Sequence, residues 1–273
     1  MESLTAFENY LIEEEKSSLT IEKYVRDVRQ FEEWLAGRPI TKAETLAFKA
    51  HLIERYAVSS VNSMLSALNC YLVFIGQTNC RVRIIKAQRT AFCAEEKELT
   101  KSDYQRLLRA ADNKSWLQLL MQTIAATGIR VSEHRFITVE AAKGGKAEVR
   151  CKGKVRTILL PQKLCRVLLA YARRKQIGSG SIFVSRRGRP IDRSRIWAEM
   201  KKLCKAAKVL AEKVFPHNLR HLFARTFYSM EKDVVRLADI LGHSSIDTTR
   251  IYTVESGRIH RKQIEKIPLI YIT

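Results

Sequence analysis

Apolar residues recur along this chain with the spacing of an α-helix, and no other feature restricts the possible folds as strongly. In the first 76 residues this spacing produces three separate helical faces. They consist of Leu4, Phe7 and Leu11; of Tyr24, Val28, Phe31 and Leu35; and of Val61, Met64, Leu65, Leu68 and Leu72. The sequence therefore predicts a small all-helical bundle over residues 1–80.

Capping residues mark where helices of this bundle begin. Thr41 followed by Glu44 forms a capping-box pattern and predicts the start of a third helix. Ser59 or Ser60 is expected to cap the fourth helix. Helices this short are marginal in isolation, so we expect them to pack on one another.

A second region, residues 99–273, mixes helical and strand patterns. Thr100 with Asp103 predicts another helix cap, and an apolar helix is expected over residues 116–126. Short β-branched segments predict a three-stranded antiparallel sheet at residues 136–139, 147–151 and 155–160. Helical patterns return at residues 162–177, 194–208, 218–230 and 234–241. The predicted fold class is mainly α (α+β), with a helical N-terminal domain and a mostly helical second domain.

Positive charge dominates the chain of 273 residues, which carries 49 Lys and Arg against 28 Asp and Glu. The formal net charge of +21 at pH 7 repels itself unless a polyanion neutralises it, so nucleic acid is the expected partner. The charge is also clustered, since residues 146–175 hold ten basic side chains and one acidic one. A protein of membrane surfaces would instead need a basic amphipathic helix or a lipid-attachment motif, and we find neither.

Between Gly76 and Leu99 the helical spacing fades while basic residues recur. Taken alone, this stretch fits a linker that lies along phosphates and a merely solvated loop equally well. We interpret residues 81–98 as a basic linker between domains at residues 1–80 and 99–273. The expected DNA contacts are Arg81, Arg83 and Lys86 in the linker and Lys154 and Arg156 in the basic stretch.

Other classes of protein are disfavoured by what the chain lacks. No segment is long and apolar enough to cross a bilayer, and the start has no basic region before an apolar run, so we expect a cytoplasmic, nucleoid-associated protein. The six cysteines form no C-x-x-C pair and have no histidine at zinc-finger spacing, which favours reduced packing thiols. Neither a metal nor a cofactor is expected.

Three short segments of the second region carry residues suited to phosphodiester chemistry. Breaking such a bond without a metal or a nucleotide needs a nucleophile, cations on the non-bridging oxygens and an acid for the leaving oxygen. Each motif alone is weak, but the order and spacing of all three are hard to obtain by chance. The segments contain, in order, Arg130; His217 and Arg220; and His243 and Tyr252.

With these motifs the second domain resembles the tyrosine recombinase family of phage integrases and Xer-type and Cre-type recombinases. The first domain is similar to the SAM-like core-DNA-binding domain of that family. The resemblance implies a site-specific recombinase that cuts and rejoins DNA through a 3′-phosphotyrosyl bond. It implies Tyr252 as the nucleophile, Arg130 and Arg220 as the pair that grips the scissile phosphate, and His217 and His243 as hydrogen-bonding partners of that phosphate.

The family's general acid is a lysine on the turn of a β-hairpin. Lys152 aligns best with it, and Lys154 stays open because this turn is shorter than the usual glycine-lysine-glycine form. Glu133 matches the acidic residue that follows the first arginine, although a helix-end partner for a nearby arginine fits it equally. His134 stands where the family usually has an apolar residue, and we assign His134 and His221 to structure.

The resemblance also implies double-stranded DNA as the partner and a homotetramer in the synaptic complex, with a monomer or weak dimer when free. The apolar tail from Arg258 onward is expected either to pack on its own domain or to dock on a neighbouring subunit. Two other functions stay open, a relaxing activity like that of type IB topoisomerases and a non-catalytic DNA-binding accessory protein. The complete set of site residues argues against the second.

Overall fold

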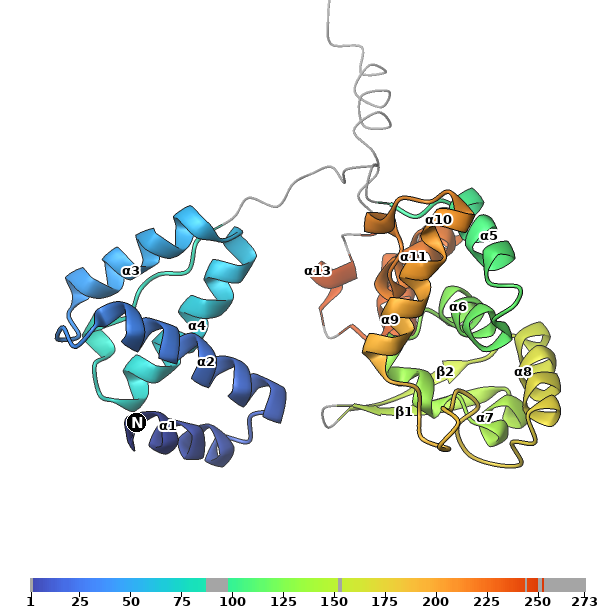
Figure 1. Cartoon of the computed structure of the whole chain (residues 1–273), viewed down its shortest axis with the longest axis horizontal. Helices are drawn as coiled ribbons and strands as arrows, with labels where there is room; N and C mark the ends of the chain where they lie inside the picture. Colours follow the sequence, from blue (N-terminus) through green and yellow to red (C-terminus); the bar gives the residue numbers. More distant parts are fainter. Residues whose placement is uncertain (1, 87–97, 152–153, 244, 250–251, 253–273) are drawn as a thin grey trace, which may run out of the picture. The chain divides into compact units, whose positions relative to one another are not determined.

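The computed structural model describes residues 2–86, 98–151, 154–243, 245–249 and 252. Internal contacts divide the chain into two compact units, Met1–Arg89 and Thr90–Thr273, both drawn in Figure 1. The division falls inside the stretch 81–98 that we interpret as a linker. The predicted fold class, mainly α with one small sheet, is confirmed.

Over its described residues the N-terminal unit is a helical bundle, as the apolar spacing predicts. Its helices are α1 (Glu2–Glu13), α2 (Ser18–Leu35), α3 (Lys42–Arg55) and α4 (Val58–Phe74). Thr41 caps α3, because its hydroxyl accepts a hydrogen bond from the Glu44 amide at 3.2 Å. The expected cap of α4 at Ser59 or Ser60 is wrong, since this helix begins before both serines, directly after Ala57.

Aromatic contacts between helices hold this bundle together. Phe31 of α2 and Phe48 of α3 are buried, with ring centroids 5.0 Å apart. Phe7 of α1 meets Tyr71 of α4 edge-on at 5.2 Å. The apolar faces identified in the sequence are thereby removed from water. Burial of each large side chain stabilises the bundle by about 1.5–3 kcal/mol.

After α4 and the short turn η1 (Thr78–Cys80) the chain runs along the N-terminal unit as an extended segment. The Asn69 side chain bonds both backbone groups of Val82, at 2.8 and 2.9 Å, and Asn62 bonds those of Ile85 at 2.9 and 2.8 Å. Because these amides hold the backbone, the Val82 side chain is buried in the core while Arg83 and Ile84 face solvent. The predicted DNA contacts of this segment, Arg81, Arg83 and Lys86, are exposed, and their contact with DNA stays a prediction.

Helices also make up most of the second unit. In chain order they are α5 (Lys101–Ala110), α6 (Ser115–Thr127), η3 (Val131–Phe136), α7 (Val139–Gly144), α8 (Gln162–Arg174), α9 (Arg193–Lys202), α10 (Cys204–Ala207), η4 (Ala211–Lys213), α11 (Pro216–Glu231), α12 (Val234–Leu241) and α13 (Ile246–Thr249). Thr100 and Asp103 form the predicted capping box of α5, with both hydrogen bonds at 3.0 Å. The helix predicted over residues 194–208 is interrupted at Leu203, between α9 and α10. None of the described helices has the length and apolar character needed to cross a membrane.

The sheet is smaller than predicted. β1 (Lys146–Cys151) and β2 (Lys154–Leu159) form an antiparallel hairpin. The third strand predicted at residues 136–139 is wrong, because Thr138 caps α7 by accepting a hydrogen bond from the Ala141 amide at 3.0 Å. Thr138 itself makes an isolated β-bridge with Ser181 and does not extend the hairpin. Helix capping therefore overrides the strand preference of the β-branched residues in this stretch.

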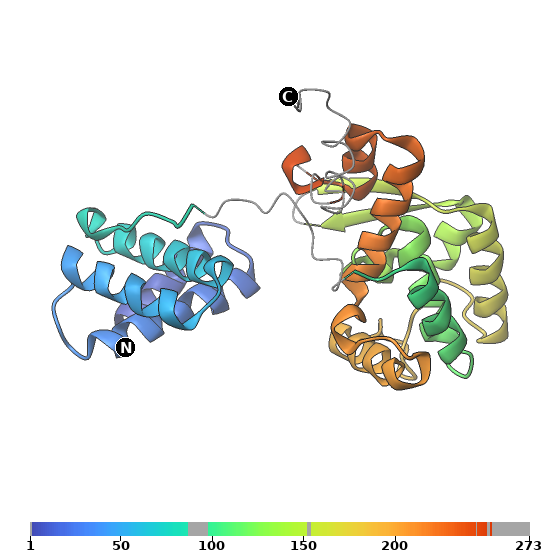
Figure 2. The same cartoon turned by 90° about the horizontal axis from the view of Figure 1, so that it is seen from above.

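The core of the second unit is built around α6. This helix contacts α8, α9 and α11, and α8 and α11 lie on either side of it (Figure 1 and Figure 2). Leu120 and Ile124 on α6 are fully buried, and Val149 and Ile158 of the hairpin turn into the same core. The C-terminal end of α6 is thus held by packing on several sides.

Gly128 ends α6 in the left-handed conformation, with φ at +66°. A Cβ atom at this position would lie 2.5 Å from Cδ1 of Phe223 and 2.9 Å from Cδ2 of Leu241. Both the backbone angle and the available space therefore require glycine where the chain leaves α6.

Replacing Gly128 with Ala should lower the free energy of unfolding of the second unit by about 2–6 kcal/mol, since left-handed alanine and overpacking each cost roughly 1–3 kcal/mol. Urea denaturation followed by the fluorescence of Trp116 and Trp197, which lie in this unit, measures the change. Gly144→Ala is the matched control, because a Cβ atom at Gly144 meets nothing within 4 Å. A Gly128→Ala midpoint equal to that of the control would contradict this account.

Candidate active site

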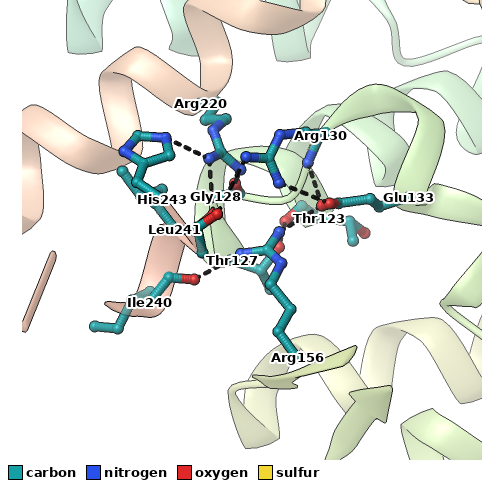
Figure 3. A network of polar contacts seen from close by, with 11 residues as sticks. Thr123, Thr127, Gly128, Arg130, Glu133, Arg156, Arg220, Ile240, Leu241 and His243 are labelled. Carbon is teal, nitrogen blue, oxygen red and sulfur yellow. Dashed lines mark hydrogen bonds and ion pairs between the residues drawn. The ribbon is translucent and has the colours of Figure 1, made fainter. Parts of the chain in front are cut away.

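A buried guanidinium lies at the centre of the second unit. Arg220 is only 1% exposed and comes from the second turn of α11, which begins at Pro216. Its Nη1 donates to the Gly128 carbonyl at 2.5 Å, and its Nη2 donates to the Leu241 carbonyl and to Nε2 of His243, both at 2.9 Å (Figure 3). Within the described part of the chain, no carboxylate forms an ion pair with this cation.

Burial first, and then the nearby charge of Arg130, lower the pKa of Arg220 to about 10, while Tyr252 acts in the opposite direction. The group stays protonated at neutral pH even so. A buried cation bonded only to neutral acceptors is costly to maintain, and a bound anion would relieve that cost.

Arg130 lies two residues after Gly128 and caps the start of η3, and Glu133 of η3 fixes its position. The Arg130 amide donates to Oε2 of Glu133 at 2.7 Å, and Nη1 donates to Oε1 at 3.0 Å. Nη2 reaches the Gly242 carbonyl at 3.4 Å, yet 41% of the side chain is exposed. Arg130 is therefore held in place while part of its guanidinium is open to a ligand.

Glu133 binds a second cation, Arg156 of β2. Nη2 of Arg156 donates to Oε2 of Glu133 at 2.5 Å, and Nη1 donates to the Ile240 carbonyl at 2.8 Å. Burial alone would raise the pKa of the Glu133 carboxyl, but the Arg130 amide and the two guanidiniums outweigh it and lower the pKa below its usual range. Arg156, expected on the sequence as a DNA contact, is bonded within the site and only 15% exposed.

His243 follows α12, which Gly242 ends in the left-handed conformation with φ at +64°. Arginine only donates hydrogen bonds, so Nε2 of His243 must accept from Arg220. The proton therefore sits on Nδ1, which donates to Oγ1 of Thr249 at 2.8 Å. Burial and the neighbouring arginines, Arg220 first among them, lower the pKa of His243 to about 4, so the ring is neutral at neutral pH.

Tyr252 is buried, at 4% exposure, and its ring lies between histidines of the same site. It stacks on His243 with centroids 6.1 Å apart and meets His221 edge-on at 4.9 Å. His221 in turn contacts the ring of His217 at 4.4 Å. The phenol is thus close to Arg220 although Tyr252 lies 21 positions beyond the last residue of α11, Glu231.

His221, which we assign to structure from the sequence, lies among the rings of the site. Its ring lies between His217 and Tyr252, and its Nε2 is buried without a hydrogen-bond partner among the described residues. Its pKa falls to about 4, mainly through burial, and burial likewise lowers the pKa of His217. The four-residue spacing of these histidines on α11 places them on one side and was the available signal.

His134, also assigned to structure, lies in the core. Its Nδ1 is 2.5 Å from the Val131 carbonyl, and its ring meets Phe183 edge-on at 6.3 Å. Burial lowers the pKa of this ring. A neutral imidazole therefore occupies the place where an apolar residue was expected.

The second unit brings together the predicted arginines, histidines and tyrosine in one place. Lys152 lies outside the described residues, as does the side chain of Lys154, so the choice of general acid stays a prediction. The part of the chain that the structure describes holds no group of three or more His, Cys, Asp or Glu that could bind a metal ion. Chemically, the arrangement can bind an oxyanion on two guanidiniums beside a tyrosine.

Such an arginine pair beside a tyrosine on a helical fold defines a phosphoryl-transfer site of the tyrosine recombinase class. A model of the phage integrase family matches residues 97–257, and a model of the phage integrase N-terminal SAM-like domain matches residues 4–77. Tyrosine recombinase XerA of Pyrococcus furiosus is 30% identical over 98% of this chain and 95% of its own length. Tyrosine recombinase XerC of Roseiflexus castenholzii is also 30% identical, over 92% of this chain and 88% of its own.

Solved structures show the same likeness. The match to the crystal structure of XerA recombinase covers 99% of this chain and 99% of that chain at 26% identity, with a TM-score of 0.53. A lambda integrase dimer bound to a COC′ core site covers 100% of this chain and 99% of its own at 20% identity, with a TM-score of 0.74, which concerns the fold alone. The chain belongs to the phage integrase family and is a tyrosine-type site-specific recombinase.

Stability should fall as the pH drops from about 6.5 towards 4. An unfolded histidine takes up a proton near pH 6.5, whereas His221 and His243 in the folded unit do so only near 4. Between these values the unfolded state binds more protons, so acid favours unfolding. Urea denaturation at a series of pH values measures the slope, and His243→Asn should make it shallower. A slope equal to that of the wild type in this variant would contradict the assignment.

Proposed function

We propose that this recombinase cleaves DNA by attack of Tyr252 on a backbone phosphate that Arg130 and Arg220 hold. The observation that carries the proposal is the buried Arg220 guanidinium, whose partners are all neutral. A phosphodiester is an anion of the size and geometry that a pair of guanidiniums binds bidentately. The phosphate would occupy the open side of Arg130, next to Arg220.

The charge balance of the site supports this role. The arginines Arg130, Arg156 and Arg220 face the single carboxylate of Glu133, and the histidines of the site are neutral at neutral pH. These described residues therefore carry two positive charges more than negative ones. A phosphodiester brings one negative charge, and a second develops in the pentacoordinate transition state. The excess matches the transition state better than the ground state, which is the condition for rate acceleration.

In the cleavage step a bond forms between Oη of Tyr252 and phosphorus while the bond from phosphorus to the 5′ oxygen breaks. The phenol gives up its proton to water, and the hairpin lysine, Lys152 in our assignment, protonates the leaving 5′ oxygen and then regains a proton from water. The 3′-phosphotyrosyl bond conserves the energy of the phosphodiester. A second DNA 5′-hydroxyl can therefore reverse the reaction without ATP, so cutting and joining are one reaction in two directions.

We further propose that the chain acts as a homotetramer on two DNA duplexes and exists as a monomer or weak dimer when free. The net charge of +21 suits a duplex as partner. Among similar solved structures are XerH bound to a difH substrate and a lambda integrase tetramer bound to a Holliday junction. The proposed place of action is the cytoplasm, at the nucleoid. The tail that could join the subunits lies outside the described residues.

Tyr252→Phe should abolish covalent attachment to DNA, because the variant keeps the ring and loses the attacking oxygen. Nicked duplexes made from the DNA that flanks the gene serve as suicide substrates, and denaturing gels score the adduct. Tyr228→Phe is the matched control on α11 and should retain the adduct. An adduct in Tyr252→Phe would remove the proposed nucleophile, whereas relaxation of supercoils without site preference would favour a topoisomerase-like activity.

Lys152→Ala should slow cleavage by about 100-fold or more, whereas Lys154→Ala should retain most of the activity. A substrate with sulfur in place of the scissile 5′ oxygen needs no general acid, because a thiol ionises near pH 8.5. It should restore cleavage by Lys152→Ala. Loss of activity in Lys154→Ala, together with wild-type rates in Lys152→Ala, would transfer the acid role to Lys154.

A further inference from the structure

We propose that Arg156 is a positioning residue, which aims both phosphate-binding arginines by holding the groups that accept their hydrogen bonds. This inference rests on the proposed function of Arg130 and Arg220. It assigns to Arg156 a role in cleavage that involves no contact with DNA.

The first group that Arg156 holds is the carboxylate of Glu133. Oε2 of Glu133 accepts from Nη2 of Arg156 and from the Arg130 amide, while Oε1 accepts from Nη1 of Arg130. Without Arg156, the buried carboxylate would have Arg130 as its only cation among these partners. It would then draw the Arg130 guanidinium towards itself and away from the phosphate.

The second group is the turn that follows α12. Nη1 of Arg156 donates to the Ile240 carbonyl, while the next two carbonyls, of Leu241 and Gly242, accept from Arg220 and Arg130 (Figure 3). Three consecutive carbonyls thus bind three different arginines. Fixing the first of them restrains the direction of the other two.

The turn also closes directly on the Arg156 side chain. A Cβ atom on Gly242 would lie 2.5 Å from Cδ of Arg156 and 3.1 Å from its Nε. Arg156 comes from the middle of β2, where it pairs with Val149 across the hairpin. The sheet therefore holds the backbone of Arg156, while its guanidinium donates to Glu133 and to Ile240 at the same time. A shorter side chain, or one with a single donor, could not make both hydrogen bonds.

The position contrasts with the other arginine of the hairpin. Arg150 on β1 is 76% exposed, and its nearest carboxylate, Glu148, lies 3.9 Å away and is itself exposed. Arg150 carries the same charge on the same hairpin without reaching the site. It provides a matched control for any general effect of lost positive charge on DNA binding.

The test measures single-turnover cleavage and DNA affinity separately for Arg156→Gln, Arg156→Lys and Arg150→Gln. Arg156→Gln should lose about 10- to 100-fold in cleavage rate, as is usual for groups that orient a reactive site, with DNA affinity within about 3-fold of the Arg150→Gln control. Arg156→Lys keeps the charge and loses the fork, so its rate should be intermediate. Cleavage by both Arg156 variants at the wild-type rate would overturn the proposal.

The substrate with sulfur at the scissile 5′ position distinguishes how Arg156 acts. If Arg156 aims the phosphate-binding arginines, the defect should persist on this substrate, because the thiol leaving group bypasses only the acid. Recovery of the wild-type rate would mean that Arg156 acts through the hairpin lysine, and the proposal would fail. The double variant Arg156→Gln with Glu133→Gln should lose less cleavage rate than the product of the two single fold-losses, since both substitutions remove the same contact.

Failure of the proposed function would look different from failure of this inference. If the wild-type protein forms no tyrosyl adduct at all, the cleavage chemistry itself is wrong. If the wild type forms the adduct and Arg156→Gln forms it equally fast while remaining folded in urea titrations, only the positioning role of Arg156 is lost.

Discussion

A positive charge enclosed by the protein and bonded only to neutral atoms is the constraint on which this molecule depends. Arg220 is almost fully buried, and its partners are two backbone carbonyls and one neutral imidazole. Folding must supply the energy to keep it there, through the packing of α6, α11 and α12 around it. In exchange, the charge has no anionic partner among the described residues to give up when a phosphate arrives, so little reorganisation is needed at the moment of reaction.

The histidines complete the site without changing its charge. His243 uses one ring nitrogen to accept from Arg220 and the other to donate to Thr249, which fixes both its orientation and its tautomer. His221 and His217 line the same side and are also discharged by burial. Had these rings been charged, they would repel the guanidiniums that they border. Neutrality lets them shape the site around Tyr252 while, among the described residues, the arginines supply the positive field.

Much of this could be predicted from the sequence, because helical spacing, the cap at Thr100 and the order of the motifs are local signals. The family and the helical fold followed from them. Local signals failed where a distant partner decides the outcome. The bonds that hold Arg156 within the site could not be predicted, because Glu133 lies 23 residues away and the other partner, 84 residues away, is the Ile240 carbonyl, which leaves no trace in residue type. Likewise, the place of His221 in the site depends on the ring of Tyr252, which lies outside α11.

The carbonyls at the C-terminal ends of α6 and α12 have a consequence for how such enzymes diverge. Helix C-termini carry partial negative charge, so they can cradle cations without any acidic side chain. Because every residue has a carbonyl, the hydrogen bond from Arg156 does not depend on which side chain stands at Ile240, so long as the helix still stops at the same place. Selection then acts on where helices end more than on what those residues are. Distant relatives can therefore share this arrangement of carbonyls and cations while few of their residues remain identical.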